Sequence, residues 1–92
     1  MIKTIHIKGK NVGKLMLYAL STCIWCKKTK KLLDELRIEY EYVDVDLLEG
    51  EDSARAKDEI RKWNPQCSFP TLVINGERCI TGFDEKKIRE LA

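Results

Sequence analysis

The sequence predicts an α/β domain in which a four-stranded mixed sheet is flanked by three helices. Two observations predict this class: short apolar runs alternate with segments of helical periodicity, and a strong hairpin turn lies near the C-terminal end. Glycine and proline fall only between these segments, where turns are needed. The expected order is strand, helix, strand, helix, hairpin and helix, with an extra N-terminal edge strand as an option.

The length and composition are those of one ordinary globular domain. A chain of 92 residues can bury one apolar core, so we expect a single domain over residues 1–92 and a monomer. With 43% hydrophobic and 35% charged residues, disordered and fibrous classes are excluded. The formal net charge of +2 is too small to indicate a nucleic-acid partner.

The distribution of apolar residues predicts a cytoplasmic protein without a membrane partner. No apolar stretch approaches the roughly 20 residues that a membrane span requires. Residues 1–6 lack the apolar segment and the cleavage site of an export signal. In a reducing cytoplasm, four cysteines are better explained by catalysis or metal binding than by structural disulfides.

The first strands are predicted from apolar patterning. Residues 2–8 alternate imperfectly between apolar and polar side chains, which gives the optional edge strand, and residues 9–13 form a turn. Residues 1–14 thus form an N-terminal extension of the domain. Residues 15–20 are continuously apolar, as in a central strand that is covered on both faces.

A helix and a second strand follow. The spacing predicts a helix from residue 23 to about residue 37, whose apolar face carries Thr29, Leu32, Leu33 and Leu36. Residues 40–46 alternate between apolar side chains and carboxylates, which indicates the next strand. Because a helix crosses over between the two strands, we expect them to be parallel and the crossover to be right-handed.

The second half of the chain predicts a helix, a hairpin and a short last helix. The second helix covers residues 51–63 and ends at Asn64-Pro65. Residues 71–74 and 78–81 flank the turn Asn75-Gly76, which is the strongest short-range hairpin signal. Residues 84–91 then form the last helix.

The most informative motif is the pair Cys23 and Cys26, which lies between the first central strand and the following helix. Two thiols on the first turn of a helix can form a disulfide with little backbone movement, and the free N–H groups of that turn stabilise the anion of the outer sulfur. The other cysteines are Cys67 and Cys79, and eleven residues separate them. That spacing does not provide the second half of a zinc site. We expect both to be packing residues, with Cys67 near enough to the motif to form mixed disulfides as the alternative.

The helix that begins with the cysteines has an unusual distribution of charge. Its first turns carry the run Lys27-Lys28-Thr29-Lys30-Lys31, and Asp34-Glu35 lies near its end, which is the reverse of what the helix dipole favours. The other two predicted helices follow the dipole rule. We therefore take Lys27, one turn from Cys23, as a candidate that stabilises the thiolate or binds an acidic partner. The alternative is a solvated basic face.

Other polar residues and aromatics are interpreted individually. Asp44 and Asp46 are expected to be solvated carboxylates without a catalytic pairing, and His6 is expected on the surface of the edge strand. Trp25, between the two cysteines, is expected to be exposed and to contact substrate, whereas Trp63 is expected in the core.

Three motifs in this order resemble the glutaredoxins and the small glutaredoxin-like redoxins. They are Cys23-Ile24-Trp25-Cys26 after a strand, Ser68-Phe69-Pro70 before the hairpin, and Gly82-Phe83-Asp84 before the last helix. The resemblance covers residues 15–91. It implies the thioredoxin-like fold, with no bound cofactor and no metal.

The resemblance also implies a thiol–disulfide oxidoreductase that reduces protein or low-molecular-weight disulfides. Cys23 would be the nucleophile and Cys26 the resolving thiol, and the two would form a redox-active disulfide. Pro70 would follow a cis peptide bond, and the backbone before it would pair with an extended substrate. The segment from Gly82 to Asp84 would lie close by and bind the thiol partner.

The chain differs from the usual family pattern at several positions. Ile24 and Trp25 stand in place of proline and tyrosine, Leu20 replaces a lysine that commonly helps to hold glutathione, and Ser68 and Phe69 replace threonine and valine. The run of residues 81–83 resembles redoxins that take electrons from a flavoprotein reductase. Either that reductase or glutathione, or another small thiol, is therefore expected as the reductant.

The alternative function is a binding or carrier module, in which the same cysteines hold a metal or an iron–sulfur cluster. Some glutaredoxin relatives hold such a cluster with one cysteine and glutathione. A second cysteine competes with cluster ligation by forming an internal disulfide.

Overall fold

The computed structural model describes residues 4–92, and five strands of this part of the chain form one mixed sheet. Its order is β1-β3-β2-β4-β5. The strands are β1 (Ile5–Ile7), β2 (Leu15–Ala19), β3 (Tyr40–Asp44), β4 (Thr71–Ile74) and β5 (Arg78–Thr81). β2 and β3 are parallel, and the other three pairs are antiparallel. The predicted fold is confirmed, including the extra edge strand, although Ile2 and Lys3 of that prediction lie outside the described residues.

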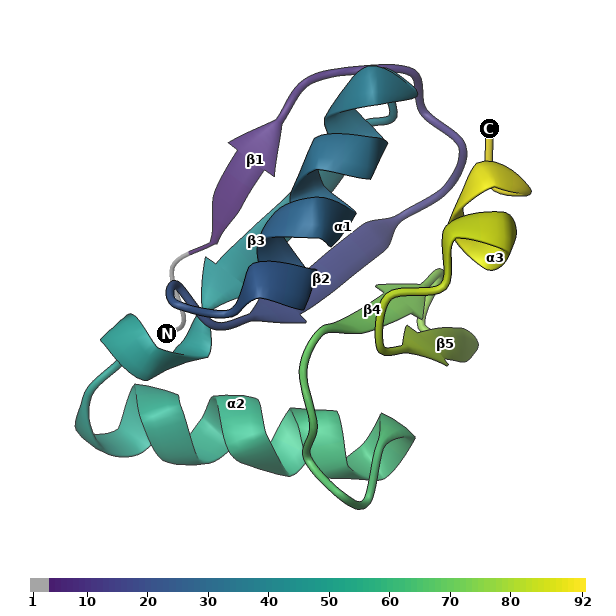
Figure 1. The fold of residues 1–92 in the computed structure, drawn as a ribbon. Coiled ribbons are helices and arrows are strands. Elements are labelled where there is room, and N and C mark those ends of the chain that lie inside the picture. Colours follow the sequence, from purple (N-terminus) through teal and green to yellow (C-terminus); the bar gives the residue numbers. More distant parts are fainter. Residues whose placement is uncertain (1–3) are drawn as a thin grey trace.

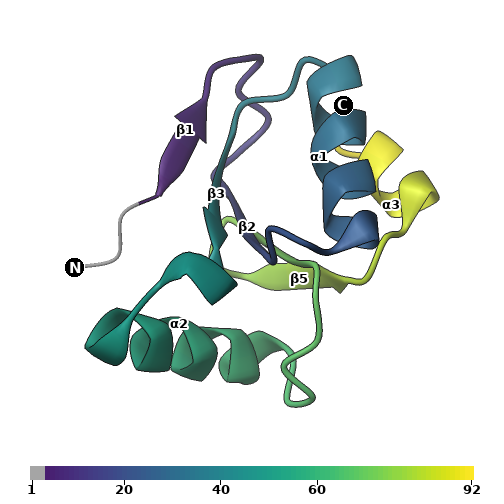
Figure 2. The same ribbon diagram turned by 60° about the vertical axis from the view of Figure 1, so that its left-hand side comes forward.

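Three α-helices and one 3₁₀ turn complete the fold of the described residues. They are α1 (Ile24–Glu35), η1 (Val45–Leu47), α2 (Gly50–Trp63) and α3 (Glu85–Arg89). Figures 1 and 2 show α1 and α3 together on one face of the sheet and α2 on the opposite face. None of the helices within residues 4–92 combines the length and the apolar character needed to cross a membrane.

The core has two parts, one on each face of the sheet. Leu17 of β2 packs with Leu33 and Ile88 on the face covered by α1 and α3, whereas the next residue, Tyr18, packs with Ile60 beneath α2. Successive side chains of a strand point to opposite faces. Because both faces of β2 are covered, its sequence is continuously apolar rather than alternating.

Three strands are shorter than predicted. The edge strand expected over residues 2–8 covers Ile5–Ile7, without Thr4 and Lys8 of the described residues. The other two end at the site described below. The strand expected over residues 40–46 ends at Asp44 because the chain turns into η1, where Leu48 N–H donates to Val45 O at 3.1 Å. The strand expected over residues 15–20 ends at Ala19. Leu20 O instead accepts a hydrogen bond from Cys23 N–H at 3.2 Å, which begins the turn into α1.

The predicted helices differ from the observed ones by a few residues at their ends. α1 ends at Glu35 rather than near Arg37, because Arg37 has a φ of 56°, which an α-helix does not accept. α3 covers Glu85–Arg89 rather than residues 84–91, with Asp84 as its N-cap. The hairpin is confirmed, with positive φ at both Asn75 and Gly76 as its turn requires.

Candidate active site

Cys23 and Cys26 lie at the N-terminal end of α1 as a dithiol of unequal exposure. Cys23 is the N-cap residue and is partly exposed, and its Sγ accepts a hydrogen bond from Cys26 N–H at 3.2 Å. Cys26 has 0% of its surface exposed. Burial, together with the hydrogen bond to Cys23, raises the pKa of Cys26 to about 12. The arrangement presents one thiol to solvent and keeps the second protonated behind it.

The loop before Cys23 is fixed by a carboxylate from η1. Asp46 accepts hydrogen bonds from Ser21 N–H at 2.8 Å and from Ser21 Oγ–H at 2.5 Å, and these bonds lower the pKa of Asp46. Asp46 is exposed, as predicted, but it is not merely solvated. It ties the loop that carries Cys23 to the end of β3.

Lys30 and Asp44 form a partly buried ion pair on the inner side of α1, which the sequence interpretation missed. Lys30 Nζ lies 2.9 Å from Asp44 Oδ1, and the two side chains keep 20% and 15% of their exposure. The prediction of a solvated Asp44 is therefore wrong, because its carboxylate lies under the helix. The available signal was the position of Lys30, four residues after Cys26 and so on the same helix face.

Trp25 and Phe83 form an aromatic surface beside the cysteines. Their rings stack with centroids 6.0 Å apart, and Lys28 Nζ lies 4.5 Å from the centroid of the Trp25 ring. Trp25 is 52% exposed, as predicted, and its neighbour Ile24 is 64% exposed. Two of the three sequence motifs, far apart in the chain, thus meet through this ring pair.

The Ser68-Phe69-Pro70 segment lies next to β2 and to the third motif. The Phe69–Pro70 peptide bond is cis, as the resemblance implied. Thr71, the next residue, pairs with Tyr18 of β2, and Pro70 O accepts a hydrogen bond from Gly82 N–H at 2.8 Å. Phe69, Phe83 and Cys23 all pack against the same core cluster, so the three motifs lie around one region.

A buried amide supports this segment, and it too was missed in the sequence. Asn64 Nδ2 donates to Ser68 Oγ at 2.7 Å, to Ser68 O at 3.3 Å and to Thr71 Oγ1 at 3.2 Å. Asn64 is 6% exposed. The sequence showed this residue only as a helix end, because nothing local reveals that its side chain turns toward a loop four residues later.

Lys27 and Asp84, two of the predicted site residues, make no contact with the cysteine side chains that the structure shows. The Lys27 side chain is exposed and makes no ion pair within residues 4–92, although Lys27 N–H donates to Cys23 O at 3.0 Å as part of the helix. Asp84 caps α3, since its carboxylate accepts a hydrogen bond from Lys87 N–H at 3.1 Å.

Cys67 and Cys79 lie on the opposite side of the sheet from α1. Both are partly buried against the core beneath α2, with Trp63, and Cys79 Sγ–H donates to Trp63 O at 3.4 Å. Their packing agrees with the sequence prediction, although neither is fully buried. Within residues 4–92, no group of three or more His, Cys, Asp or Glu side chains is placed to hold a metal ion.

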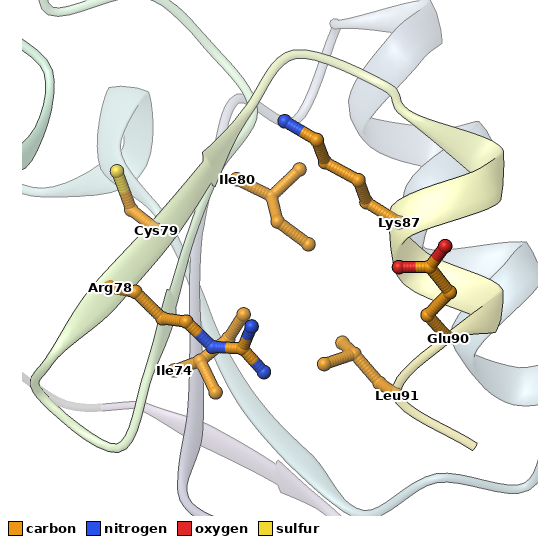
Figure 3. Close-up of a pocket in the computed structure, with 7 residues that line it drawn as sticks. All are labelled: Ile74, Arg78, Cys79, Ile80, Lys87, Glu90 and Leu91. Carbon is orange, nitrogen blue, oxygen red and sulfur yellow. The ribbon is translucent and has the colours of Figure 1, made fainter.

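A cavity between β5 and α3 is separate from the dithiol. It has a volume of about 330 Å³ and is lined by Ile74, Arg78, Cys79, Ile80, Lys87, Glu90 and Leu91. Figure 3 shows Ile80, Leu91 and the Arg78 guanidinium around it, whereas Cys79 points away. None of the predicted site residues contributes to this cavity.

The family model described as Glutaredoxin matches residues 15–79 of the chain. The chain belongs to the glutaredoxin family. Its fold is similar to that of methanoredoxin from Methanosarcina acetivorans, with 53% identity, a TM-score of 0.88, and coverage of 90% of this chain and 87% of that one.

Two further glutaredoxins of known structure are similar to this one. The protein from Methanosarcina mazei Go1 shares 52% identity, with a TM-score of 0.90 and coverage of 97% of this chain and 86% of the other. A buckwheat glutaredoxin, solved as a complex with glutathione, shares 27% identity, with a TM-score of 0.65 and coverage of 83% and 68%.

Proposed function

We propose that this glutaredoxin reduces disulfides of proteins or small molecules by dithiol exchange, with Cys23 as the nucleophile and Cys26 as the resolving thiol. The observation that carries the proposal is the contrast within the pair: Cys23 is partly exposed and receives an N–H hydrogen bond, whereas Cys26 is fully buried. Family membership supports thiol oxidoreductase chemistry in general.

The reaction has two exchange steps. Cys23 thiolate attacks one sulfur of the substrate disulfide, so that a mixed disulfide forms and the other substrate sulfur leaves as a thiolate. Cys26 then loses its proton and attacks Cys23 Sγ, which releases the second substrate thiol and leaves a Cys23–Cys26 disulfide. Because Cys26 is held beside Cys23, the second step is unimolecular and is favoured over capture by another thiol.

The substrate would lie across the region where the three motifs meet. The stacked rings of Trp25 and Phe83 offer an apolar surface, and the segment from Ser68 to Pro70 offers backbone groups for an extended chain. Lys27 remains a candidate for attraction of acidic substrates, because its side chain is exposed and makes no ion pair within residues 4–92. Asp84 supports this region indirectly, as the cap of α3.

The resulting disulfide must be reduced by a thiol or by a reductase. The glutathione complex of the buckwheat relative supports a small thiol as donor, whereas Leu20 lacks the positive charge that would hold a glutathione carboxylate. A comparison of glutathione with its reductase, a thioredoxin reductase and other small thiols, all with one disulfide substrate, identifies the donor. A cytoplasmic location and a monomeric state remain predictions.

The central test uses two cysteine variants. We expect Cys23→Ser to abolish disulfide reduction, and Cys26→Ser to accumulate a mixed disulfide between Cys23 and the substrate, visible by mass spectrometry. Cys79→Ser serves as the matched control, since this cysteine lies beneath α2, and it should keep wild-type activity. Equal loss in both motif variants without a trapped species would refute the assigned roles.

A further inference from the structure

A cation lies one helical turn behind the buried cysteine of the dithiol. Lys30 follows Cys26 by four residues on α1, so the two side chains share a face of the helix. Lys30 Nζ lies 2.9 Å from Asp44 Oδ1 and 4.0 Å from the centroid of the Tyr42 ring. Since Lys30 keeps 20% of its side-chain exposure, water screens this charge less than that of a surface lysine.

Strand β3 fixes the position of this lysine. Tyr42 and Asp44 are two residues apart on β3 and therefore point to the same face, toward α1. Asp44 also pairs in register with Ala19, the last residue of β2, from which the chain runs through Leu20 toward the dithiol. The ammonium is thus held at the place where the central strands end and the catalytic helix begins.

The second exchange step is where such a charge matters. Cys26 must become an anion although none of its surface is exposed, and burial raises its pKa to about 12. A backbone hydrogen bond with Leu20 and, to a smaller extent, the charge of Lys30 act in the opposite direction and favour the thiolate. Once Cys23 carries the substrate, its sulfur bears no negative charge, so the repulsion between the two sulfurs disappears and the attraction by Lys30 remains.

We propose that Lys30 is a positioning residue that holds a cation behind Cys26 and thereby speeds release of the product. This inference rests on the proposed function. In the step concerned, the Cys26 S–H bond breaks and its proton passes to solvent. The thiolate attacks Cys23 Sγ, the bond from Cys23 Sγ to the substrate sulfur breaks, and the departing thiolate takes a proton from water. The two cysteines are oxidised to a disulfide, and the substrate disulfide is reduced to two thiols.

The other charged and titratable groups around Lys30 allow a test of sign. Cys26 faces it from the first turn of α1, Tyr42 and Asp44 from β3, and Asp46 from η1. Asp44 opposes part of the field of Lys30. Loss of Lys30 should therefore slow the attack by Cys26, and loss of Asp44 should speed it. If the ion pair only stabilised the fold, loss of either residue would change this rate in the same direction.

Both exchange steps can be followed in one reaction with dithiobis(nitrobenzoate), an aromatic disulfide whose thiolate product is yellow. Attack by Cys23 releases the first thiolate at a rate that depends on reagent concentration. Attack by Cys26 releases the second at a rate that does not. The same reaction with Cys23→Ser measures the contribution of Cys67 and Cys79, which is subtracted.

We expect Lys30→Met to slow the second phase about threefold or more near neutral pH and to leave the first phase nearly unchanged. The rise of the second-phase rate with pH should move to higher pH, so that the deficit shrinks in alkaline solution. Asp44→Asn should make the second phase faster, and Lys30→Arg should retain the wild-type rate. Lys31→Met, which removes the neighbouring exposed lysine, is the matched control and should match the wild type.

The proposal is overturned if Lys30→Met leaves the second phase unchanged, or if Lys30→Met and Asp44→Asn slow it equally at every pH. Should Lys30→Met fail to fold, Asp44→Asn decides alone, since a second phase that is slower or unchanged contradicts an electrostatic role. Failure of the proposed function looks different. In that case the wild type shows no second phase whose rate is independent of reagent concentration, or Cys26→Ser still shows such a phase.

Discussion

The backbone N–H of Cys26 donates to Cys23 Sγ at 3.2 Å, so the second cysteine of the pair provides a hydrogen bond to the sulfur of the first. An N-cap position is usually occupied by a side-chain oxygen that accepts such a bond, and here a sulfur takes that place. A sulfur anion accepts this bond better than a protonated thiol does. The hydrogen bond that begins α1 therefore also points an N–H donor at the sulfur that we propose as the nucleophile.

The first prediction concerns the unequal reactivity of the two thiols. Because Cys26 is fully buried and its pKa is raised to about 12, almost none of it is thiolate near neutral pH. We expect iodoacetamide to label Cys26 of the reduced protein at least about a hundredfold more slowly than Cys23. Peptide mass spectrometry over time measures both rates, and the denatured protein serves as the control. Similar rates in the folded protein would contradict the structure.

The second prediction concerns stability in alkaline solution. Burial raises the pKa of Cys26 to about 12, and it also raises the pKa of Tyr40, whose hydroxyl donates to Asp34 Oδ1 at 3.1 Å. The folded state thus retains protons that the unfolded chain loses at lower pH. The stability from these groups is complete below the ordinary values of 9.0 and 10.0, and it is lost as pH rises toward the folded-state values.

We therefore expect the free energy of unfolding of the reduced protein to fall as pH rises above about 9. Denaturant titrations over a pH series measure this fall. Tyr40→Phe and Cys26→Ala should each make the fall shallower, although both also weaken the core. A free energy of unfolding that stays constant between neutral and strongly alkaline pH would be inconsistent with these two shifts.

Most of the fold follows from local patterns in the sequence. The continuous apolar run of β2 and the Asn75-Gly76 turn each depend on rules that act within a few residues, and both were identified correctly. The ends of β3 and α1 were misplaced. They depend on Leu48 N–H bonding to Val45 O and on the positive φ of Arg37, which composition does not reveal.

The parts of the site that depend on residue type and local spacing could be predicted from the sequence. The contacts between residues far apart in the chain could not. The spacing of Cys23 and Cys26, with two residues between them, is sufficient to indicate a redox pair. By contrast, Asp44 meets Lys30 across fourteen residues, and Asp46 meets Ser21 across twenty-five. Both carboxylates looked like solvent-facing groups, since their partners depend on the parallel pairing of β2 with β3.

The third prediction separates substrate binding from stability at Trp25. This ring is 52% exposed, so its removal should change the free energy of unfolding by less than about 1 kcal/mol. Trp25→Ala removes the stack on Phe83 and the contact with Lys28, and we expect KM for a peptide disulfide to rise severalfold with kcat nearly unchanged. Trp25→Phe keeps an aromatic ring and is the matched control. An unchanged KM in Trp25→Ala would exclude this ring from the binding surface.

The fourth prediction concerns Asn64, whose amide joins the end of α2 to the segment before Pro70. Asn64→Ala removes the amide N–H donor that Ser68 and Thr71 share. The Asn64 side chain is in the protein interior, with 6% of the residue exposed. We expect a loss of about 1–3 kcal/mol in the free energy of unfolding, because the buried Thr71 hydroxyl loses a hydrogen-bond donor. Gln66→Ala, which truncates an exposed side chain in the same loop, is the matched control.

The consequence for activity follows from the position of that loop. Since Pro70 O accepts from Gly82 N–H, movement of the segment in Asn64→Ala also disturbs the third motif, and KM for a peptide disulfide should rise. Alkylation of Cys23 should remain near the wild-type rate, because α1 and its N-cap bond are untouched. Denaturant titration, steady-state kinetics and alkylation together measure these effects. Equal stability of Asn64→Ala and Gln66→Ala would show that the amide does not hold this part of the site.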